Sequence, residues 1–265
     1  MKLKVIITHA DYEPWRSIST KGQMPTWISA SSENVIFAQG KKLPTWIRSI
    51  DSKLWGLRWK KKTGLIVLLI EIAVLRLLNR FVAKPRIVRV SSKITIWDIW
   101  MPDSDFLMSK KIEAVFKRAE LEHFDFLVMT TSSSYLNMRV LKSELNTMPR
   151  TGFAGGKKVS QGRNTFLSGS FRVFSKDVAT RVSENYKKRN LKMVEDMALG
   201  DLLRQLKIPL VDIPSLNIES ELELSRMENR RIKSQSHFRL KSGTMNKRND
   251  VSLMLKLHKI IEGTK

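Results

Sequence analysis

Cysteine is absent from the 265-residue chain, and histidine occurs only four times. Without cysteine there can be no disulfide bond, no thiolate nucleophile and no cysteine-ligated zinc. The four histidines, at positions 9, 123, 237 and 258, include no pair with the spacing of a zinc site. We interpret His123 and His258 as packing residues, because each falls on the apolar face of an expected helix.

The signature motifs of several enzyme classes are also missing. The chain has no Gly-x-x-x-x-Gly-Lys-Ser/Thr, no Gly-x-Gly-x-x-Gly and no Gly-x-Ser-x-Gly sequence. These absences exclude a P-loop nucleotidase, a typical dinucleotide-binding dehydrogenase and a hydrolase with a nucleophile elbow.

Long apolar runs are scarce. The longest covers residues 64–75 and is interrupted by Glu71, whereas a helix that crosses a bilayer needs about 20 apolar residues. The first residues lack the apolar region and cleavage site of a secretory signal. We therefore predict a cytoplasmic protein.

Positive charge, by contrast, is in large excess. The chain has 48 Lys and Arg against 25 Asp and Glu, a formal net charge of +23. The excess is concentrated in residues 41–93, 150–176 and 226–248, which hold 14, 6 and 8 basic residues. Such a field attracts nucleic acid, anionic lipid or phosphorylated substrates, which makes peripheral attachment to the inner face of the membrane a hypothesis. The alternative is a solvated surface that only aids solubility.

Apolar residues recur with strand and helix periods in alternation, which predicts one main α/β domain. We expect helices over residues 14–30, 65–82, 108–123 and 141–148, and others beginning after Ser175, at Glu195 and at Asp250. Ser175 and Asp250 are interpreted as helix caps, residues 149–162 as a loop, and residues 219–248 as a polar and mobile segment. The expected strands cover residues 2–8, 35–38, 86–90, 95–100, 124–129, 166–174 and 210–213.

Ligands of open α/β sheets bind at the carboxyl ends of the strands. Three features fall there: the Thr/Ser turn at residues 130–134, Gly169, and the helix start with Glu195 and Asp196. The two carboxylates are also explained by compensation of the helix dipole. The residues alone therefore predict only a basic α/β protein with a candidate acidic site.

Six segments in order resemble the beta-1,3-galactosyltransferase/Fringe-like glycosyltransferase family. Two correspond to its Ile-Arg-x-Thr-Trp element and to the strand end that follows it. The others correspond to its Asp-Ser-Tyr…Lys, Asp-Asp-Asp, Ser-Gly-Gly-Gly-Tyr-Val-Leu-Ser-Arg-Asp and Glu-Asp-Val-x-x-Gly elements. In this chain the segments are residues 18–27, 37–40, 103–111, 124–137, 168–177 and 195–200.

The resemblance implies a GT-A type fold, a Rossmann-like nucleotide-sugar-binding core with a mixed central sheet flanked by helices. The expected domain covers residues 1–218, with a basic insert at about 41–93 that has no counterpart in the family. Residues 219–265 would form a basic segment and a final helix packed on the same domain. The implied activity is hexosyl transfer from a nucleotide sugar, a UDP-sugar by preference, to a glycan or lipid-linked glycan.

The resemblance also assigns roles to residues. Asp196 would be the general base of an inverting transfer, with Glu195 supporting the helix start or the acceptor. Thr8 and Thr26 would line the nucleotide pocket, and Gly169 would leave room for a sugar. The family's metal-binding Asp-x-Asp falls on Thr131, Ser132 and Ser133, whose hydroxyls are poor ligands for a divalent ion. Cationic groups would then neutralise the diphosphate, and the candidates are Lys157, Lys158, Arg163, His237 and Arg239.

Two alternatives remain open. A nucleic-acid-binding protein is suggested by Trp46, Trp55 and Trp59, which stand among basic residues and could stack on bases. The other alternative is a pseudo-glycosyltransferase that has the fold without the activity.

Overall fold

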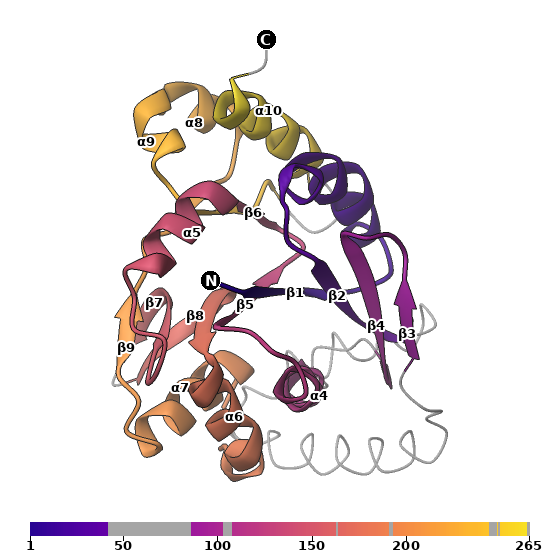
Figure 1. The fold of residues 1–265 in the computed structure, drawn as a ribbon. Helices are drawn as coiled ribbons and strands as arrows, with labels where there is room; N and C mark the ends of the chain where they lie inside the picture. The colour runs from indigo at the N-terminus through magenta and orange to yellow at the C-terminus, as the bar shows by residue number, and fades with distance from the viewer. Residues whose placement is uncertain are drawn as a thin grey trace, which may run out of the picture.

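The computed structural model describes residues 1–41, 86–102, 108–162, 164–190, 193–243, 248 and 250–263. Its centre is a mixed eight-stranded sheet in the order β3-β4-β2-β1-β5-β8-β7-β9 (Figure 1). Neighbours pair in parallel from β4 to β5, whereas β3 and β8 run antiparallel to them. The strands are β1 (Leu3–His9), β2 (Val35–Lys41), β3 (Arg86–Arg89), β4 (Ile94–Pro102), β5 (Phe126–Thr131), β7 (Ala154–Gln161), β8 (Asn164–Ser175) and β9 (Leu210–Asp212).

Helices cover both faces of this sheet, which explains why its central strands are continuously apolar. In β1, Val5 and Ile7 belong to one apolar cluster and Ile6 to the other, and all three side chains are fully buried. The Ile6 cluster lies under α4 (Met108–Glu120), α6 (Lys176–Asn185) and α7 (Glu195–Gln205). The opposite face is covered by η1 (Ile18–Ile28), which continues the short α1 (Trp15–Ser17), and by α5 (Met138–Asn146) and α10 (Asp250–Glu262).

A second sheet of three strands lies beyond the carboxyl end of β5. Its order is β10 (Leu216–Ile218), β11 (His237–Leu240) and β6 (Ser134–Leu136). Between β10 and β11 the chain forms α8 (Glu221–Arg226) and α9 (Asn229–Lys233). The expectation that residues 219–248 form one mobile segment was therefore wrong, because Leu224, Ile232 and Phe238 supply buried apolar anchors.

Residues 149–162 were also misread, since the expected loop contains β7, which pairs with β8 in a hairpin. Gly155 and Gly156 favoured a loop in the sequence, but here they permit close packing of two strands. A Cβ atom at Gly156 would lie 2.3 Å from the carbonyl oxygen of Phe171, and its φ of +145° also requires glycine. The short turn contains Gly162, with φ +59°.

One smaller expectation failed, and another was confirmed only in part. His123 is exposed beyond the end of α4 and does not pack on an apolar face. Ser175 does stand at the N-cap position of α6, as expected, but its hydroxyl donates to the carboxylate of Asp177, 2.6 Å away, and makes no capping bond to the helix backbone. The other expected elements in the described ranges are present. The helix expected at residues 65–82, the segment 103–106 and the three tryptophans at 46, 55 and 59 lie outside the described residues.

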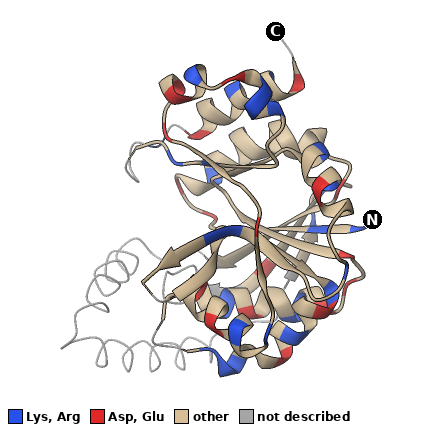
Figure 2. Ribbon diagram, turned by 90° about the vertical axis from the view of Figure 1, so that its left-hand side faces the viewer, with Lys and Arg blue, Asp and Glu red and all other residues tan. Residues whose placement is uncertain are grey.

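Lys and Arg lie on the helices of both layers, interspersed with Asp and Glu (Figure 2). Most of the basic insert at 41–93 falls in the undescribed range 42–85. Within the described part of the chain, no helix is both long enough and apolar enough to span a bilayer.

Candidate functional site

The connections of the main sheet change direction at β1. The chain passes from β1 to β2 on one side and later returns to β5 on the other side. The carboxyl ends of β1 and β5 therefore mark a topological switch point, where ligands of open α/β sheets bind. Thr8 pairs in register with Thr131 at this edge, and the turn with Ser132 and Ser133 follows directly.

Side chains from β1 and η1 hold one side of this turn. The Ser132 hydroxyl lies 3.2 Å from Nδ1 of His9, which also contacts the hydroxyl of Ser19 at 3.1 Å. Nε2 of Gln23 donates to the carbonyl oxygens of Thr131 and Ser134, at 3.1 and 2.9 Å. Burial, and then the charge of Lys111, lower the pKa of His9 to about 4, so the His9 ring is neutral at pH 7.

An arginine from the C-terminal segment holds the other side. Nη2 of Arg248 donates to the Ser133 hydroxyl at 2.9 Å and to the carbonyl oxygen of Leu240 at 3.0 Å. The guanidinium pairs with the fully buried Asp250, and it lies 4.6 Å from the ring centroid of Trp15. The Ser133 hydroxyl thus contacts a cation, at the position where the resemblance implies a metal-binding carboxylate.

A buried ion-pair cluster lies next to this turn. Arg172, on β8, has a side chain only 1% exposed and forms two hydrogen bonds to Glu195, at 2.9 and 2.6 Å. Its Nη2 also contacts Oδ1 of Asp196 at 2.5 Å. One guanidinium therefore pairs with both carboxylates at the start of α7.

The two carboxylates differ in exposure and in pKa. The Glu195 side chain is 9% exposed, and burial raises its pKa to about 7 although Arg172 acts in the opposite direction. The Asp196 side chain is 35% exposed. Burial would raise the pKa of Asp196 as well, but the charge of Arg172 and hydrogen bonds from Glu195 and Gly169 hold it below its usual value. Asp196 is thus an accessible, ionised carboxylate at neutral pH.

Gly169 makes this packing possible. Its backbone N–H donates to Oδ2 of Asp196 at 2.8 Å. A Cβ atom at position 169 would lie 2.8 Å from Oδ1 of Asp196 and 3.1 Å from Nη2 of Arg172. The glycine therefore lets the backbone approach the carboxylate, a role different from the space for a sugar that the resemblance implies.

Strand β11 links the turn to the acidic cluster. His237 stacks on Phe171 with ring centroids 4.4 Å apart, and its ring nitrogens contact the hydroxyls of Ser134 and Ser215. Burial, and then the charge of Arg239, lower the pKa of His237 to about 3, so the ring is neutral. Arg239 is opposite Ser134 in register, and its charge contributes to the lowered pKa of Asp196. In this strand Arg239, not His237, supplies positive charge to the site.

The remaining predicted residues lie farther from this cluster or outside the description. The hydroxyls of Thr8 and Thr26 donate to the backbone carbonyls of Thr130 and Gly22, and Thr26 is fully buried. Lys157 and Lys158 lie on β7, which β8 separates from β5. Arg163 lies outside the described residues.

The donor groups at the turn do not fit a divalent ion. The hydroxyls of Ser132 and Ser133 contact His9 and Arg248, and the Thr131 hydroxyl lies 3.3 Å from that of Ser134. In the parts of the chain that the structure describes, no three His, Asp or Glu side chains gather as a metal site. The chemistry of this turn therefore rests on hydroxyls, backbone groups and arginines.

Sequence reasoning missed His9, Arg172 and Arg248. An arginine inside the apolar run Phe171-Arg172-Val173-Phe174 is a usable signal, because a buried charge requires charged partners nearby. No comparable signal marks Arg248, since it stands among other basic residues.

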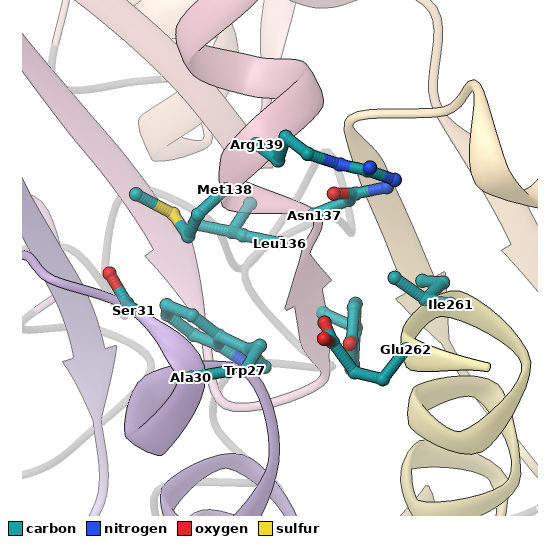
Figure 3. Close-up of a pocket in the computed structure, with 10 residues that line it drawn as sticks. Trp27, Ala30, Ser31, Leu136, Asn137, Met138, Arg139, Ile261 and Glu262 are labelled. Atoms are coloured by element: carbon teal, nitrogen blue, oxygen red, sulfur yellow. The ribbon is translucent and has the colours of Figure 1, made fainter. Parts of the chain in front are cut away.

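A separate cavity of about 280 Å³ lies between η1, the start of α5 and the end of α10. Figure 3 shows Trp27, Arg139 and Glu262 around it. The buried Nε1 of Trp27 has no hydrogen-bond partner among the described residues. None of the predicted site residues lines this cavity.

No protein-family model matches the chain, and no curated protein matches it. Among solved structures, it is similar to the crystal structure of galactosyltransferase LgtC in complex with donor and acceptor sugar analogues. The TM-score is 0.50 at 7% sequence identity, and the match covers 99% of this chain and 96% of that one. The fold is therefore of the GT-A type, as the sequence predicted.

Proposed function

We propose that the chain is a glycosyltransferase that moves a hexosyl group from a nucleotide sugar to a hydroxyl of a glycan or lipid-linked glycan. One observation carries the proposal: Asp196 presents an accessible, ionised carboxylate beside the switch point of a GT-A fold. A nucleotide sugar as donor is further supported by the donor and acceptor sugar analogues bound to LgtC. The six ordered segments support a divergent relative of the Fringe-like family.

In the proposed reaction Asp196 is the general base of an inverting transfer. The acceptor oxygen bonds to the anomeric carbon while the bond from that carbon to the diphosphate oxygen breaks. The hydroxyl proton moves to Asp196, and the nucleoside diphosphate leaves with the bonding electrons. Arg172 donates to Oδ1 of Asp196, and the N–H of Gly169 donates to Oδ2. A carboxylate has about four lone-pair sites, so Asp196 can still accept from the acceptor hydroxyl.

Glu195 and Arg172 are proposed as positioning residues. The bidentate pair fixes the guanidinium, and the guanidinium fixes the orientation of Asp196. Thr131, Ser132 and Ser133 are proposed to contact the ribose or the diphosphate. Arg239 is proposed to attract the diphosphate.

Lys157, Lys158 and Arg163 are proposed to attract the donor diphosphate, the two lysines of β7 at longer range. Neighbouring strands lie about 4.8 Å apart, so β7 is roughly 10 Å from β5 across β8. At that distance a lysine raises the local concentration of an anion more than it fixes its position. The hydroxyls of Thr8 and Thr26 already donate to backbone carbonyls, so in the proposed nucleotide contacts they would act as acceptors.

We expect donor binding that does not depend on a divalent metal, because hydroxyls and arginines stand at the turn. Calorimetry with UDP and uridine, each with and without chelator, measures this directly. The Arg239→Gln variant should weaken UDP binding by about 10-fold and leave uridine binding unchanged, because only the diphosphate carries charge. Arg226→Gln, which removes an exposed arginine of α8, is the matched control. A requirement for manganese or magnesium would refute the metal-free account.

The nucleic-acid alternative is tested by a second binding experiment. A thermal-shift screen with nucleotide sugars, nucleoside diphosphates and oligonucleotides distinguishes the two classes. Stabilisation by the nucleotides favours the transferase or a pseudoenzyme, and turnover separates those two. Stabilisation by oligonucleotides alone would favour the alternative.

Peripheral membrane attachment is a further expectation, from the basic insert at 41–93. The protein should sediment with vesicles that contain anionic lipid at low salt and be released at high salt, since salt screens exposed charges. Equal sedimentation with neutral vesicles would contradict an electrostatic origin.

A further inference from the structure

We propose that Arg248 binds the diphosphate of the donor and takes the place of the metal ion that the Fringe-like resemblance implies at this turn. The proposal rests on the proposed function, and it adds a cation that is not among the five candidates named from the sequence. The guanidinium contacts Ser133, the last residue of the Thr-Ser-Ser run that replaces Asp-x-Asp. A cation on that hydroxyl stands where a divalent ion would otherwise stand.

The position of Arg248 follows from the fold of the C-terminal segment. The backbone N–H of Leu240, at the end of β11, donates to the carbonyl oxygen of Ser133 at 2.8 Å. Nη2 of Arg248 bridges the same two residues, through the Leu240 carbonyl and the Ser133 hydroxyl. The C-terminal segment is thus joined to the switch point by both backbone and side chain.

The guanidinium is held in a fixed orientation. Nε donates to Oδ2 of Asp250 at 3.0 Å, and Nη2 contacts the same oxygen. The other carboxylate oxygen of Asp250 accepts from the backbone N–H and the hydroxyl of Ser242, at 3.1 and 2.8 Å. The face of the guanidinium lies against Trp15. Because the orientation is set before a ligand arrives, little side-chain freedom is lost on binding.

The Arg248 side chain is largely buried, with 8% of it exposed, and the described residues leave its Nη1 edge without an acceptor. A planar, permanently charged fork with a free edge suits a phosphate better than a point charge does. Arg239, in β11, adds a second positive charge on the side of Asp196. Two arginines would therefore face the two phosphates of the donor.

The competing explanation is that Arg248 only tethers the C-terminal segment. A tether and a ligand-binding residue respond differently when the charged pair is changed. The double variant Arg248→Gln/Asp250→Asn replaces the ion pair by two neutral amides, a shorter pair that can still hydrogen-bond to each other and, through the amide at position 250, to Ser242. The single variant Asp250→Asn keeps the guanidinium and removes the charge that competes for it.

The experiment is calorimetry on the full chain with UDP, GDP, inorganic pyrophosphate and the matching nucleosides. Thermal unfolding of each variant is measured in parallel. We expect the double variant to bind the preferred nucleoside diphosphate and pyrophosphate about 10- to 100-fold more weakly, as for a lost charged hydrogen bond. Its nucleoside affinity should be unchanged. Asp250→Asn should bind the diphosphate at least as well as the wild type, because the amide oxygen of asparagine can still accept from Nε and orient the guanidinium.

The outcomes separate this proposal from the proposed function. If the wild type binds a diphosphate and the double variant binds it equally well, Arg248 does not bind the diphosphate and the proposed function stands. If nucleoside and diphosphate affinities fall together, or if Asp250→Asn weakens diphosphate binding as much as the double variant does, Arg248 is only a tether. If the wild type binds neither the diphosphates nor pyrophosphate, both proposals fail.

Discussion

Asp196→Asn is expected to lower turnover by about 10²-fold or more, as for the loss of a general base. Asparagine has nearly the same shape as aspartate, and its oxygen can still accept from the N–H of Gly169. It cannot take the proton of the acceptor hydroxyl. The measurement is release of nucleoside diphosphate from a nucleotide sugar in the presence of an acceptor, with donor affinity followed separately.

The matched control is Asp201→Asn on the same helix. Asp201 is one and a half turns along α7 and pairs with Arg204 and Gln205. Its loss removes one carboxylate of equal size without touching the cluster around Arg172, so turnover should be unchanged. Equal turnover in wild type and Asp196→Asn would remove Asp196 from the mechanism. A similar loss in both variants would point to a general effect on α7.

The sheet and most helices could be predicted from the sequence because their signals are local. The central strand β1 is a short apolar run, and α4 repeats its apolar residues every three or four positions. The hairpin of β7 and β8 could not be predicted in the same way. Gly155 and Gly156 are typical of loops, and only the close approach of the Phe153 and Ile213 side chains to Gly155, and of the Phe171 backbone to Gly156, shows why a strand needs them.

The candidate site was predictable only in part, because its contacts join distant parts of the chain. The acidic pair at 195 and 196 is visible as a helix start, and the Thr/Ser turn as a strand end. Arg248 contacts Ser133 across 115 residues, and His9 contacts Ser132 across 123 residues. No periodic pattern reports such pairs. His237 shows an error of another kind. The resemblance implied that His237 helps to neutralise the diphosphate, whereas burial lowers its pKa and keeps the ring neutral.

Arg172→Met is expected to have the largest effect on stability. Removing one partner of a buried ion pair leaves an uncompensated charge and costs about 3–5 kcal/mol. Here two carboxylates lose the same partner, because Arg172 contacts both Glu195 and Asp196. Chemical denaturation at pH 7 measures the change in the free energy of unfolding. Arg204→Met, which breaks an exposed pair with Asp201 on the same helix, should cost about 1 kcal/mol or less.

The pH dependence of that loss identifies its cause. In the wild type the pKa of Glu195 is raised from 4.5 to about 7 in the folded state, and without Arg172 it should rise further. A carboxyl whose pKa is raised by folding stabilises the native state while it is protonated, and that stability is lost as the pH rises through the folded pKa. The deficit of Arg172→Met should therefore be smaller at pH 5 than at pH 8.

The triple variant Arg172→Met/Glu195→Gln/Asp196→Asn carries no buried charge at these positions, so it should regain most of the lost stability at pH 8. A deficit that is equal at both pH values and persists in the triple variant would mean that Arg172 stabilises β8 by packing alone, and that its charge does not hold Asp196 in place.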